Sequence, residues 1–265
     1  MSAKLKPLDE QVVVLTGACS GVGLCTAQLA AQRGATLVLV ARNTRLLQSL
    51  MSIIGASGRD AICLAADVTM RDEMTAAART AAARFGRIDT WINNPGLSIY
   101  GRLDQLTEAD SRRLFDVNFW GVVNGSLAAL PYLLSAGGSL INLGSEVPDE
   151  ALPLQGMYSS SKHAVKGFTD ALRAEVVGEA DAAMSITLVQ PSEPRPRLAG
   201  DFVGPSAINA ESPAAALDPN LVAEAILQAA TQGGRELNVG QPRAPGLPPN
   251  AAAMLPAASL SAKHA

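Results

Sequence analysis

The chain has 265 residues, carries a net charge of −3, and is 48% hydrophobic and 17% charged. This length and apolar content are typical of one large α/β domain with a buried core. The small negative charge excludes the basic surface that nucleic acid or an anionic membrane would need.

Three cysteines cannot form a fully paired disulfide framework, and no CxxC pair occurs, so we expect reduced thiols. The first ten residues, MSAKLKPLDE, lack the apolar stretch of a secretory signal, and no apolar run approaches the length of a membrane helix. Neither histidine has metal-ligand partners at a suitable spacing. We therefore expect a cytoplasmic protein with no membrane span and no metal site.

Short apolar runs alternate with longer helical stretches along the chain. The first run, Gln11–Thr16, leads through glycine-rich residues into a helix that ends near Arg33. Five further runs follow, at Thr36–Ala41, Ala61–Ala66, Ile88–Asn93, Ser139–Gly144 and Met184–Gln190, and a periodic segment at Glu236–Gly240 comes after them. Long helical patterns cover Thr107–Ser135, Met157–Gly178 and Leu221–Thr231. Continuous apolar runs between helices indicate strands buried on both faces, and hence parallel pairing. The sequence predicts a Rossmann-type, doubly wound α/β fold, with a parallel sheet of about seven strands flanked by helices.

The same pattern defines the domain organisation. Residues 1–10 form an N-terminal extension, and residues 11–240 form a single dinucleotide-binding and catalytic domain. Within it, residues 192–217 shift to Pro, Ala, Ser and Gly, which is typical of a long functional loop and is our candidate substrate loop. Residues 241–265 are a Pro/Ala-rich tail that we expect to be poorly ordered.

A glycine-rich turn joins the first strand to the first helix. Glycine tolerates the positive φ of a tight turn, lets the backbone approach a pyrophosphate, and lets the helix pack against the strand. The start of the helix then offers free N–H groups and the positive end of its dipole to phosphate. The predicted phosphate-binding residues are Gly17, Cys19, Ser20, Gly21, Val22 and Gly23.

The end of the second predicted strand indicates which dinucleotide binds. NAD sites usually place an acidic residue there for the ribose hydroxyls, but no acid occurs between Thr36 and Arg45. Arg42 and Asn43 occupy this position instead. A guanidinium can hold the additional 2′-phosphate of NADP through charge-assisted hydrogen bonds. The sequence therefore predicts NADP(H) as the cofactor.

Four polar residues have the spacing of a catalytic set. Tyr158 and Lys162 are four residues apart on a predicted helix and share one face. Ser145 follows the fifth predicted strand, thirteen residues before Tyr158, and Asn118 lies in the long helix before that strand. Together with the TGxxxGxG turn, this set resembles the short-chain dehydrogenase/reductase family in its single-domain form, from about Gln11 to Gly240.

The resemblance implies a role for each of the four residues. Tyr158 would be the general acid/base, Ser145 would hold the substrate oxygen, and Lys162 would bind the nicotinamide ribose. Asn118 would order a water that links Lys162 to solvent. A free tyrosine has a pKa near about 10, and a nearby ammonium favours its phenolate. The implied reaction is hydride transfer between nicotinamide and a carbonyl or alcohol, with Tyr158 moving the proton.

Other segments resemble further parts of the family template. Asp67 and Val68 resemble the pair that contacts adenine, and Asn93-Asn94-Pro95-Gly96 resembles the family's NNAG, which steadies the sheet and passes beside the cofactor through Asn94 and Gly96. Pro191 and Ser192 fall where the family places PG beside the nicotinamide. Two departures stand out: Pro95 replaces an alanine, and the family's PGxVxT reads Pro191-Ser192-Glu193-Pro194-Arg195-Pro196, without its threonine.

Other interpretations remain open at this point. The altered PGxVxT segment is compatible with a regulatory protein that binds NADP(H) with little or no turnover, and other chemistries such as epimerisation occur on this fold. Apolar residues beyond one face of the two long helices predict a homodimer or homotetramer. The candidate faces are Phe119, Val122, Val123, Leu127 and Leu130, or Val165, Phe168 and Leu172. The substrate is expected to be a small, hydrophobic carbonyl or alcohol.

Overall fold

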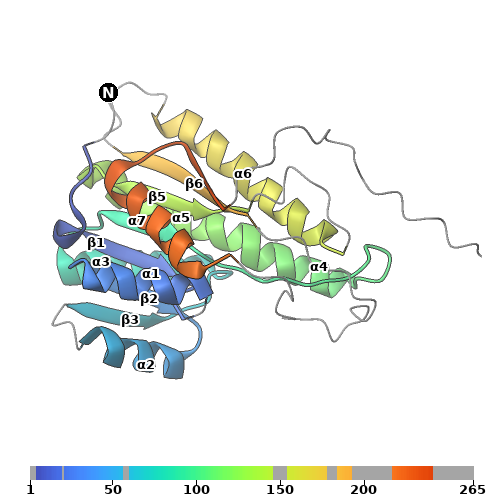
Figure 1. The fold of residues 1–265 in the computed structure, drawn as a ribbon, viewed down its shortest axis with the longest axis horizontal. Helices are drawn as coiled ribbons and strands as arrows, with labels where there is room; N and C mark the ends of the chain where they lie inside the picture. Colours follow the sequence, from blue (N-terminus) through green and yellow to red (C-terminus); the bar gives the residue numbers. More distant parts are fainter. Residues whose placement is uncertain are drawn as a thin grey trace, which may run out of the picture.

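The computed structural model describes residues 4–19, 21–55, 60–145, 154–177, 184–192 and 217–240. These residues contain a seven-stranded, fully parallel sheet in the order β3-β2-β1-β4-β5-β6-β7 (Figure 1). The strands are β1 Val12–Thr16, β2 Thr36–Ala41, β3 Ala61–Ala65, β4 Thr90–Asn93, β5 Ser139–Leu143, β6 Ser185–Pro191 and β7 Glu236–Val239. The predicted fold class is confirmed, and each strand lies within two residues of its predicted bounds.

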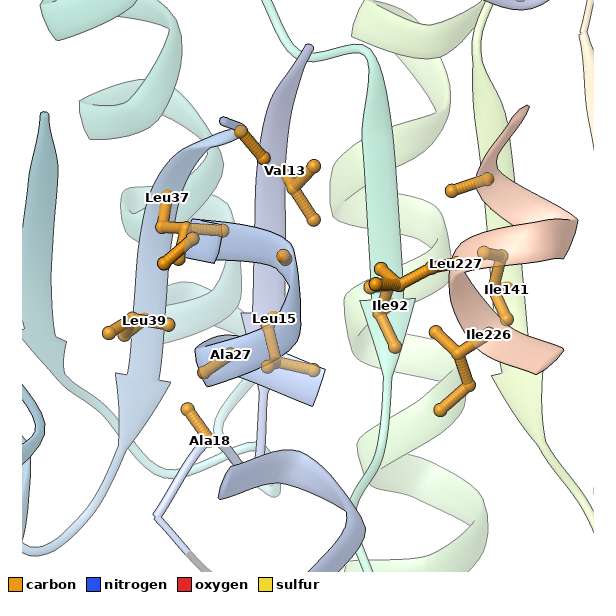
Figure 2. Packing of buried hydrophobic residues seen from close by; sticks show 14 of the residues in the cluster. Val13, Leu15, Ala18, Ala27, Leu37, Leu39, Ile92, Ile141, Ile226 and Leu227 are labelled. Carbon is orange, nitrogen blue, oxygen red and sulfur yellow. The ribbon is translucent and has the colours of Figure 1, made fainter. Parts of the chain in front are cut away.

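Helices cover both faces of the sheet (Figure 1). On one face, α1 (Gly21–Gln32), α2 (Thr44–Gly55) and α7 (Pro219–Gln232) enclose one hydrophobic cluster with the strands. Figure 2 shows Ala27 of α1 and Ile226 of α7 in this cluster, beside side chains of β1, β2, β4 and β5. On the other face, α3 (Arg71–Phe85), α5 (Gly121–Ala136) and α6 (Gly156–Val177) enclose a second cluster. Burial on both faces explains why β1 and β2 are almost entirely apolar, whereas β4 and β5 also bury polar residues such as Asn93 and Asn142.

The helix predicted over Thr107–Ser135 is divided in the structure. It begins as α4 (Glu108–Phe115), passes through a π-helical segment η2 (Asp116–Trp120), and continues as α5. Within η2, the N–H of Gly121 donates to the carbonyl of Asp116, one residue further back than in an α-helix. Sequence periodicity gave no sign of this wider turn. Single π-turns occur frequently at functional sites, and this one contains Asn118.

By length and composition alone, one helical stretch of the described residues, Glu108–Ala136, is long and apolar enough to cross a membrane. This stretch contacts α3, α6 and the strands β4 and β5 of the same chain. Those contacts are the packing of a helix inside an α/β domain.

The exposed apolar face of α5 shares only Leu127 with the faces predicted from the sequence. Val122, Val123, Val165 and Leu172 are all buried within the domain and cannot also cover a second subunit, which corrects that expectation. The residues that are exposed lie seven apart on one side of η2 and α5. They are Trp120, Leu127 and Leu134, at 51%, 37% and 48% exposure.

Candidate active site

The candidate site lies where the strand order reverses, between β1 and β4. The chain leaves β1 toward α1 on one face and leaves β4 toward α4 and α5 on the other (Figure 1). In open α/β sheets, ligands bind in the crevice at the carboxyl ends of such strands. The glycine turn and the Asn94–Gly96 segment both begin at this edge, as the sequence predicted.

Gly17 and Gly23 are required by close backbone packing in this turn. Gly17 has a φ of +65°, and a Cβ there would lie 2.2 Å from the carbonyl oxygen of Asn94. A Cβ on Gly23 would lie 2.1 Å from the carbonyl oxygen of Gly17. The helix α1 can therefore start directly against the strand ends, and its first turn contains Gly21, Val22 and Gly23. Ser20 lies outside the described residues.

Asn94 connects the two strand ends. Its backbone N–H donates to the hydroxyl of Thr16 at 3.1 Å, and its side-chain amide donates to the carbonyl of Gly17 at 3.2 Å. Its neighbour Asn93 is fully buried and donates to Asn142 of β5 and Ser126 of α5. The turn and the sheet are thus joined by side-chain hydrogen bonds, despite the proline that follows at position 95.

A pocket of about 570 Å³ opens at this edge. Eight of its lining residues were predicted from the sequence to contact the cofactor: Gly17, Cys19, Arg42, Asn43, Asp67, Val68, Asn94 and Gly96. Five others were not predicted as contacts: Ala41, Leu46, Ala66, Pro95 and Val117. Leu46 is 47% exposed. Exposure is a property of the fold, so nothing in the sequence set Leu46 apart from the other leucines of α2.

Arg42 and Asp67 face one another across this pocket. Their closest charged atoms are 3.8 Å apart, and the Arg42 side chain is 64% exposed. A pair at this distance and exposure contributes little to stability, so the guanidinium can exchange its partner for an anionic ligand. Asn43 has a local role as well, because its side-chain oxygen accepts the N–H of Leu46 in the first turn of α2.

The turn that contains Asp67 and Val68 is fixed by residues that the sequence reasoning did not identify. The carboxylate of Glu73 accepts the backbone N–H of Asp67 at 2.7 Å, and the carboxylate of Asp67 accepts the N–H of Thr69. Glu73 lies in the first turn of α3, where an acid is common in any helix. The sequence therefore gave no indication that Glu73, rather than any other acid in a first helical turn, holds the Asp67 turn in place.

The catalytic candidates are buried together at the ends of β5 and α6. Ser145 lies two residues beyond the end of β5 and is 1% exposed, while Tyr158 and Lys162 lie on α6 at 7% and 3% exposure. The ammonium of Lys162 donates to the carbonyl of Leu143 at 3.0 Å and lies 5.8 Å from the centroid of the Tyr158 ring. The Lys162 cation therefore lies within cation–π distance of the Tyr158 ring.

Asn118 is linked to this cluster through α6. Its side chain accepts the N–H of Leu97 at 2.8 Å and donates to the carbonyl of the same residue at 2.9 Å. It also donates to the hydroxyl of Ser161, which in turn donates to the carbonyl of Tyr158. Ser161 was not predicted as a site residue, since serines are common on helices. In the structure it joins η2 to the helix that carries Tyr158 and Lys162.

The substitution of serine for the family's glycine at position 192 is accommodated at the end of β6. The Ser192 hydroxyl donates to the carbonyl of Val239 at 3.0 Å, and its backbone N–H donates to the same carbonyl at 2.8 Å. Gly240 leaves room for this side chain, because a Cβ there would lie 1.5 Å from the Ser192 hydroxyl oxygen. The rest of the altered motif and the candidate substrate loop up to residue 216 lie outside the described residues.

Two cysteines lie near the cofactor pocket. Burial raises the pKa of the Cys19 thiol, and burial together with the proximity of Cys19 raises the pKa of Cys63 to about 11. Both groups are therefore protonated thiols at neutral pH rather than nucleophiles. Within the described residues, no three histidine, cysteine or acidic side chains gather in a way that could hold a metal ion.

The family model for short chain dehydrogenases matches residues 11–194. The chain belongs to the short-chain dehydrogenase/reductase family. It is 40% identical over 242 residues to the uncharacterized oxidoreductase YxnA of Bacillus subtilis, covering 89% of this chain and 67% of that protein.

Two solved structures of the family have the same fold. A metagenomic short-chain oxidoreductase in complex with NADP aligns at 26% identity with a TM-score of 0.73, over 88% of this chain and 97% of that one. A short-chain dehydrogenase/reductase from Burkholderia phymatum in complex with NAD aligns at 24% identity with a TM-score of 0.76, over 88% and 90%. The chain is therefore an oxidoreductase of this family, whose neighbours bind NAD or NADP.

Proposed function

We propose that this protein is an NADP(H)-dependent oxidoreductase that interconverts a carbonyl and an alcohol, with Tyr158 as the general acid/base. The observation that carries this proposal is the buried pair on α6, in which the Lys162 ammonium lies 5.8 Å from the Tyr158 ring centroid. Ser145, buried just beyond the end of β5, would provide a second hydroxyl to the substrate oxygen. Bound NADP(H) would supply or accept the hydride.

The residues of the chain would manage the proton and the developing charge. During reduction, the hydroxyls of Tyr158 and Ser145 donate hydrogen bonds to the carbonyl oxygen, which becomes negative, and Tyr158 gives it a proton. The positive charge of Lys162 stabilises the resulting phenolate. In the oxidation direction the same phenolate takes the proton of the alcohol. The hydrogen bonds from Asn118 through Ser161 hold the Tyr158 segment in place for both directions.

The choice of NADP(H) over NAD(H) rests on Arg42. The pocket that would hold the adenosine half has Arg42 and Asn43 at the end of β2, where an NAD site would have an acid. The guanidinium is largely exposed and only loosely paired with Asp67, so it is available to a 2′-phosphate. The structural neighbours bind one dinucleotide or the other, and the 26% identical one was solved with NADP.

The test is NADPH oxidation, followed at 340 nm, against a panel of aldehydes, ketones, diketones and 3-oxoacyl thioesters. Tyr158→Phe is measured beside the wild-type protein, and NADPH binding is measured for both. Turnover that is lost in the variant while NADPH binding is kept supports the proposal. Tight NADPH binding without turnover of any panel member would instead favour the regulatory alternative suggested by the altered Pro191–Pro196 segment.

Three further properties belong to the same proposal. The protein acts in the cytoplasm, uses no metal, and assembles as a homo-oligomer through α5. The support for the last is the apolar row of Trp120, Leu127 and Leu134, since exposed apolar residues that gather on one face mark interaction sites. A second copy of the chain is the expected partner, because members of this family commonly pair the two helices that correspond to α5 and α6 into dimers and tetramers.

A further inference from the structure

Gln190 is a buried polar residue near the end of β6, directly before Pro191. It is 4% exposed, and its side-chain NH2 group donates to the carboxylate of Glu236 and to the amide oxygen of Asn238, the latter at 3.1 Å. Both acceptors lie on β7, the edge strand of the sheet. A primary amide has two N–H donors, so β7 takes up the whole donor capacity of this side chain.

The same strand holds the residue on the other side of Pro191. The hydroxyl of Ser192 donates to the carbonyl of Val239, as described above. Gln190 and Ser192 thus fasten the end of β6 to β7 by their side chains, in addition to the backbone pairing of the two strands. This is the place where the chain departs from the family's PGxVxT, and β7 supports it.

The carbon chain of Gln190 packs against the residue that precedes Ser145. A Cβ on Gly144 would lie 3.3 Å from Cγ of Gln190 and 3.1 Å from a methyl of Leu188, so a glycine is needed for this close approach. The N–H of Gly144 also donates to the carbonyl of Val189 at 2.8 Å. Because Ser145 follows Gly144 directly and is buried, the side chain of Gln190 limits where the Ser145 backbone can lie.

Glu236 connects Gln190 to the helix α6. One carboxylate oxygen of Glu236 accepts from Gln190, and the other accepts from the ammonium of Lys166 at 2.9 Å. The side chains of Lys166 and Glu236 are 32% and 31% exposed, so the pair is partly shielded from water. Lys166 lies one turn beyond Lys162 on α6, and residues four apart are neighbours on a helix surface. The three residues Gln190, Glu236 and Lys166, here called the Glu236 bridge, therefore join the end of β6 to the helix that carries Tyr158.

We propose that the Glu236 bridge is a positioning element that sets the separation of Ser145 and Tyr158. The proposal rests on the proposed reductase function, in which both hydroxyls donate to one carbonyl oxygen. The bridge reaches Ser145 through the contact of Gln190 with Gly144, and it reaches Tyr158 through α6. Two donors serve one oxygen only when their separation is fixed, and a displacement of about 1 Å can cost about a hundredfold in rate. The bridge acts through these two residues rather than on the substrate.

Two variants break the bridge at opposite ends. Gln190→Met keeps the length of the side chain and removes its amide, while Lys166→Met keeps the carbon stem and removes the charge. Lys166→Arg retains the charge and should behave like the wild-type protein. Arg235→Ala is the matched control, because it removes a different ion pair between α6 and the residue before β7, 3.4 Å from Asp170 and outside the bridge.

The first measurement is a single turnover with NADPH already bound, followed at 340 nm, on the panel carbonyl that the wild-type protein reduces fastest. We expect the rate constant to fall about tenfold in Gln190→Met and in Lys166→Met, with unchanged NADPH affinity. The double variant should lose no more than about a further twofold, because both changes break one connection. A merely structural role would lower the amplitude, which counts folded protein, and leave the rate constant unchanged.

The second measurement needs neither cofactor nor turnover. In the ligand-free protein, the amide of Gly144 should exchange its hydrogen about tenfold faster in Gln190→Met and in Lys166→Met than in the wild-type protein. Arg235→Ala should exchange at the wild-type rate. Exchange is followed by mass spectrometry of the peptide that contains residues 143–145.

The results that overturn the proposal are distinct from failure of the proposed function. An unchanged rate constant in Lys166→Met, additive losses in the double variant, an equal loss in Arg235→Ala, or unchanged exchange at Gly144 would each remove the bridge and leave the reductase function standing. Lys166→Met alters a partly exposed residue, so it decides the matter even if Gln190→Met does not fold. Absence of wild-type turnover for the whole carbonyl panel overturns the reductase function and this inference with it.

Discussion

The side-chain amide of Asn124 donates hydrogen bonds to the backbone carbonyls of Val68 and Thr69, at 3.0 and 3.2 Å. Asn124 lies on α5 and is only 8% exposed, whereas Val68 lines the cofactor pocket. Gly121, one turn earlier on α5, approaches the same residue, because a Cβ there would lie 2.7 Å from a methyl of Val68. The helix α5 therefore positions the turn to which the resemblance assigns the adenine.

Replacing Asn124 should weaken the binding of adenine-containing ligands. In Asn124→Ala, two hydrogen bonds are lost and two carbonyls lose their partner, which costs about 1–2 kcal/mol. We expect about tenfold weaker binding of NADPH and of adenosine 2′-phosphate by calorimetry, with kcat unchanged at saturating NADPH. Ser135→Ala, an exposed position on the same helix, is the control. A lower melting temperature with unchanged affinity for both ligands would show that the contact only stabilises the fold.

Arg42 should determine the preference for the 2′-phosphate. The wild-type protein is expected to bind NADPH at least about tenfold more tightly than NADH, since a hydrogen bond to a charged group contributes about 1.5–3 kcal/mol. In Arg42→Ala the affinity for NADPH should fall by about that factor, while the affinity for NADH stays constant. Arg45→Ala, an exposed cation one turn away, tests for a general charge effect. Fluorescence titration of the three proteins with NADPH and with NADH measures these affinities, and equal wild-type affinities for the two ligands would refute the role of Arg42.

Gly17 should tolerate no side chain. Its φ of +65° disfavours any L residue, and a Cβ at 2.2 Å from the Asn94 oxygen meets rigid backbone rather than a movable side chain. Gly17→Ala should lower the free energy of unfolding by about 2–3 kcal/mol and abolish NADPH binding. Gly55→Ala is the matched control, since a Cβ at the end of α2 would meet nothing within 4 Å. Chemical denaturation and NADPH titration of both variants separate a local clash from a general effect of added bulk.

The fold and the positions of several site residues could be predicted from the sequence wherever a single physical requirement, such as burial on both faces of a strand, decides which residue types fit a position. Strands such as β2, buried on both faces, are apolar at nearly every position, so their bounds could be identified. The glycine turn was equally clear, because Gly17 and Gly23 meet backbone atoms that no other residue could approach. Tyr158 and Lys162 fall on one helix face by spacing alone, and the structure buries both.

The remaining features depend on contacts between distant segments. Glu73 and Asn124 hold the Asp67–Thr69 turn from two helices, and neither differs in its local sequence from an ordinary helix residue. The wide turn at Asn118 lies where η2 packs against α6, a contact that periodicity does not encode. For the same reason the apolar residues of α5 could not be divided into core and surface before the sheet packing was known.

The exposed face of α5 should mediate self-association. Trp120→Asp places a charge in the row formed with Leu127 and Leu134, and burying an unpaired carboxylate is costly. We expect light scattering at micromolar concentration to give a dimer or tetramer for the wild-type protein and a monomer for the variant. Leu221→Asp changes an equally exposed leucine on α7 and should leave the mass unchanged. A monomeric wild-type protein, or an oligomer that survives Trp120→Asp, would contradict an interface on this face.

Cys63 should react slowly with alkylating agents until the pH is high. Burial and the neighbouring Cys19 raise the pKa of its thiol from 9.0 to about 11, and only the thiolate is nucleophilic. At pH 8 about one molecule in a thousand then carries the thiolate, so labelling by iodoacetamide should accelerate about tenfold per pH unit up to pH 11.

Because the folded pKa is raised, the protonated thiol stabilises the fold below pH 9 and this contribution is lost as the pH rises through 11. Mass spectrometry of the Cys63 peptide measures the labelling, and Cys63→Ser should remove that part of the pH dependence of stability. Rapid labelling of the native protein at pH 8 would show that the strand edge at β3 opens to solvent.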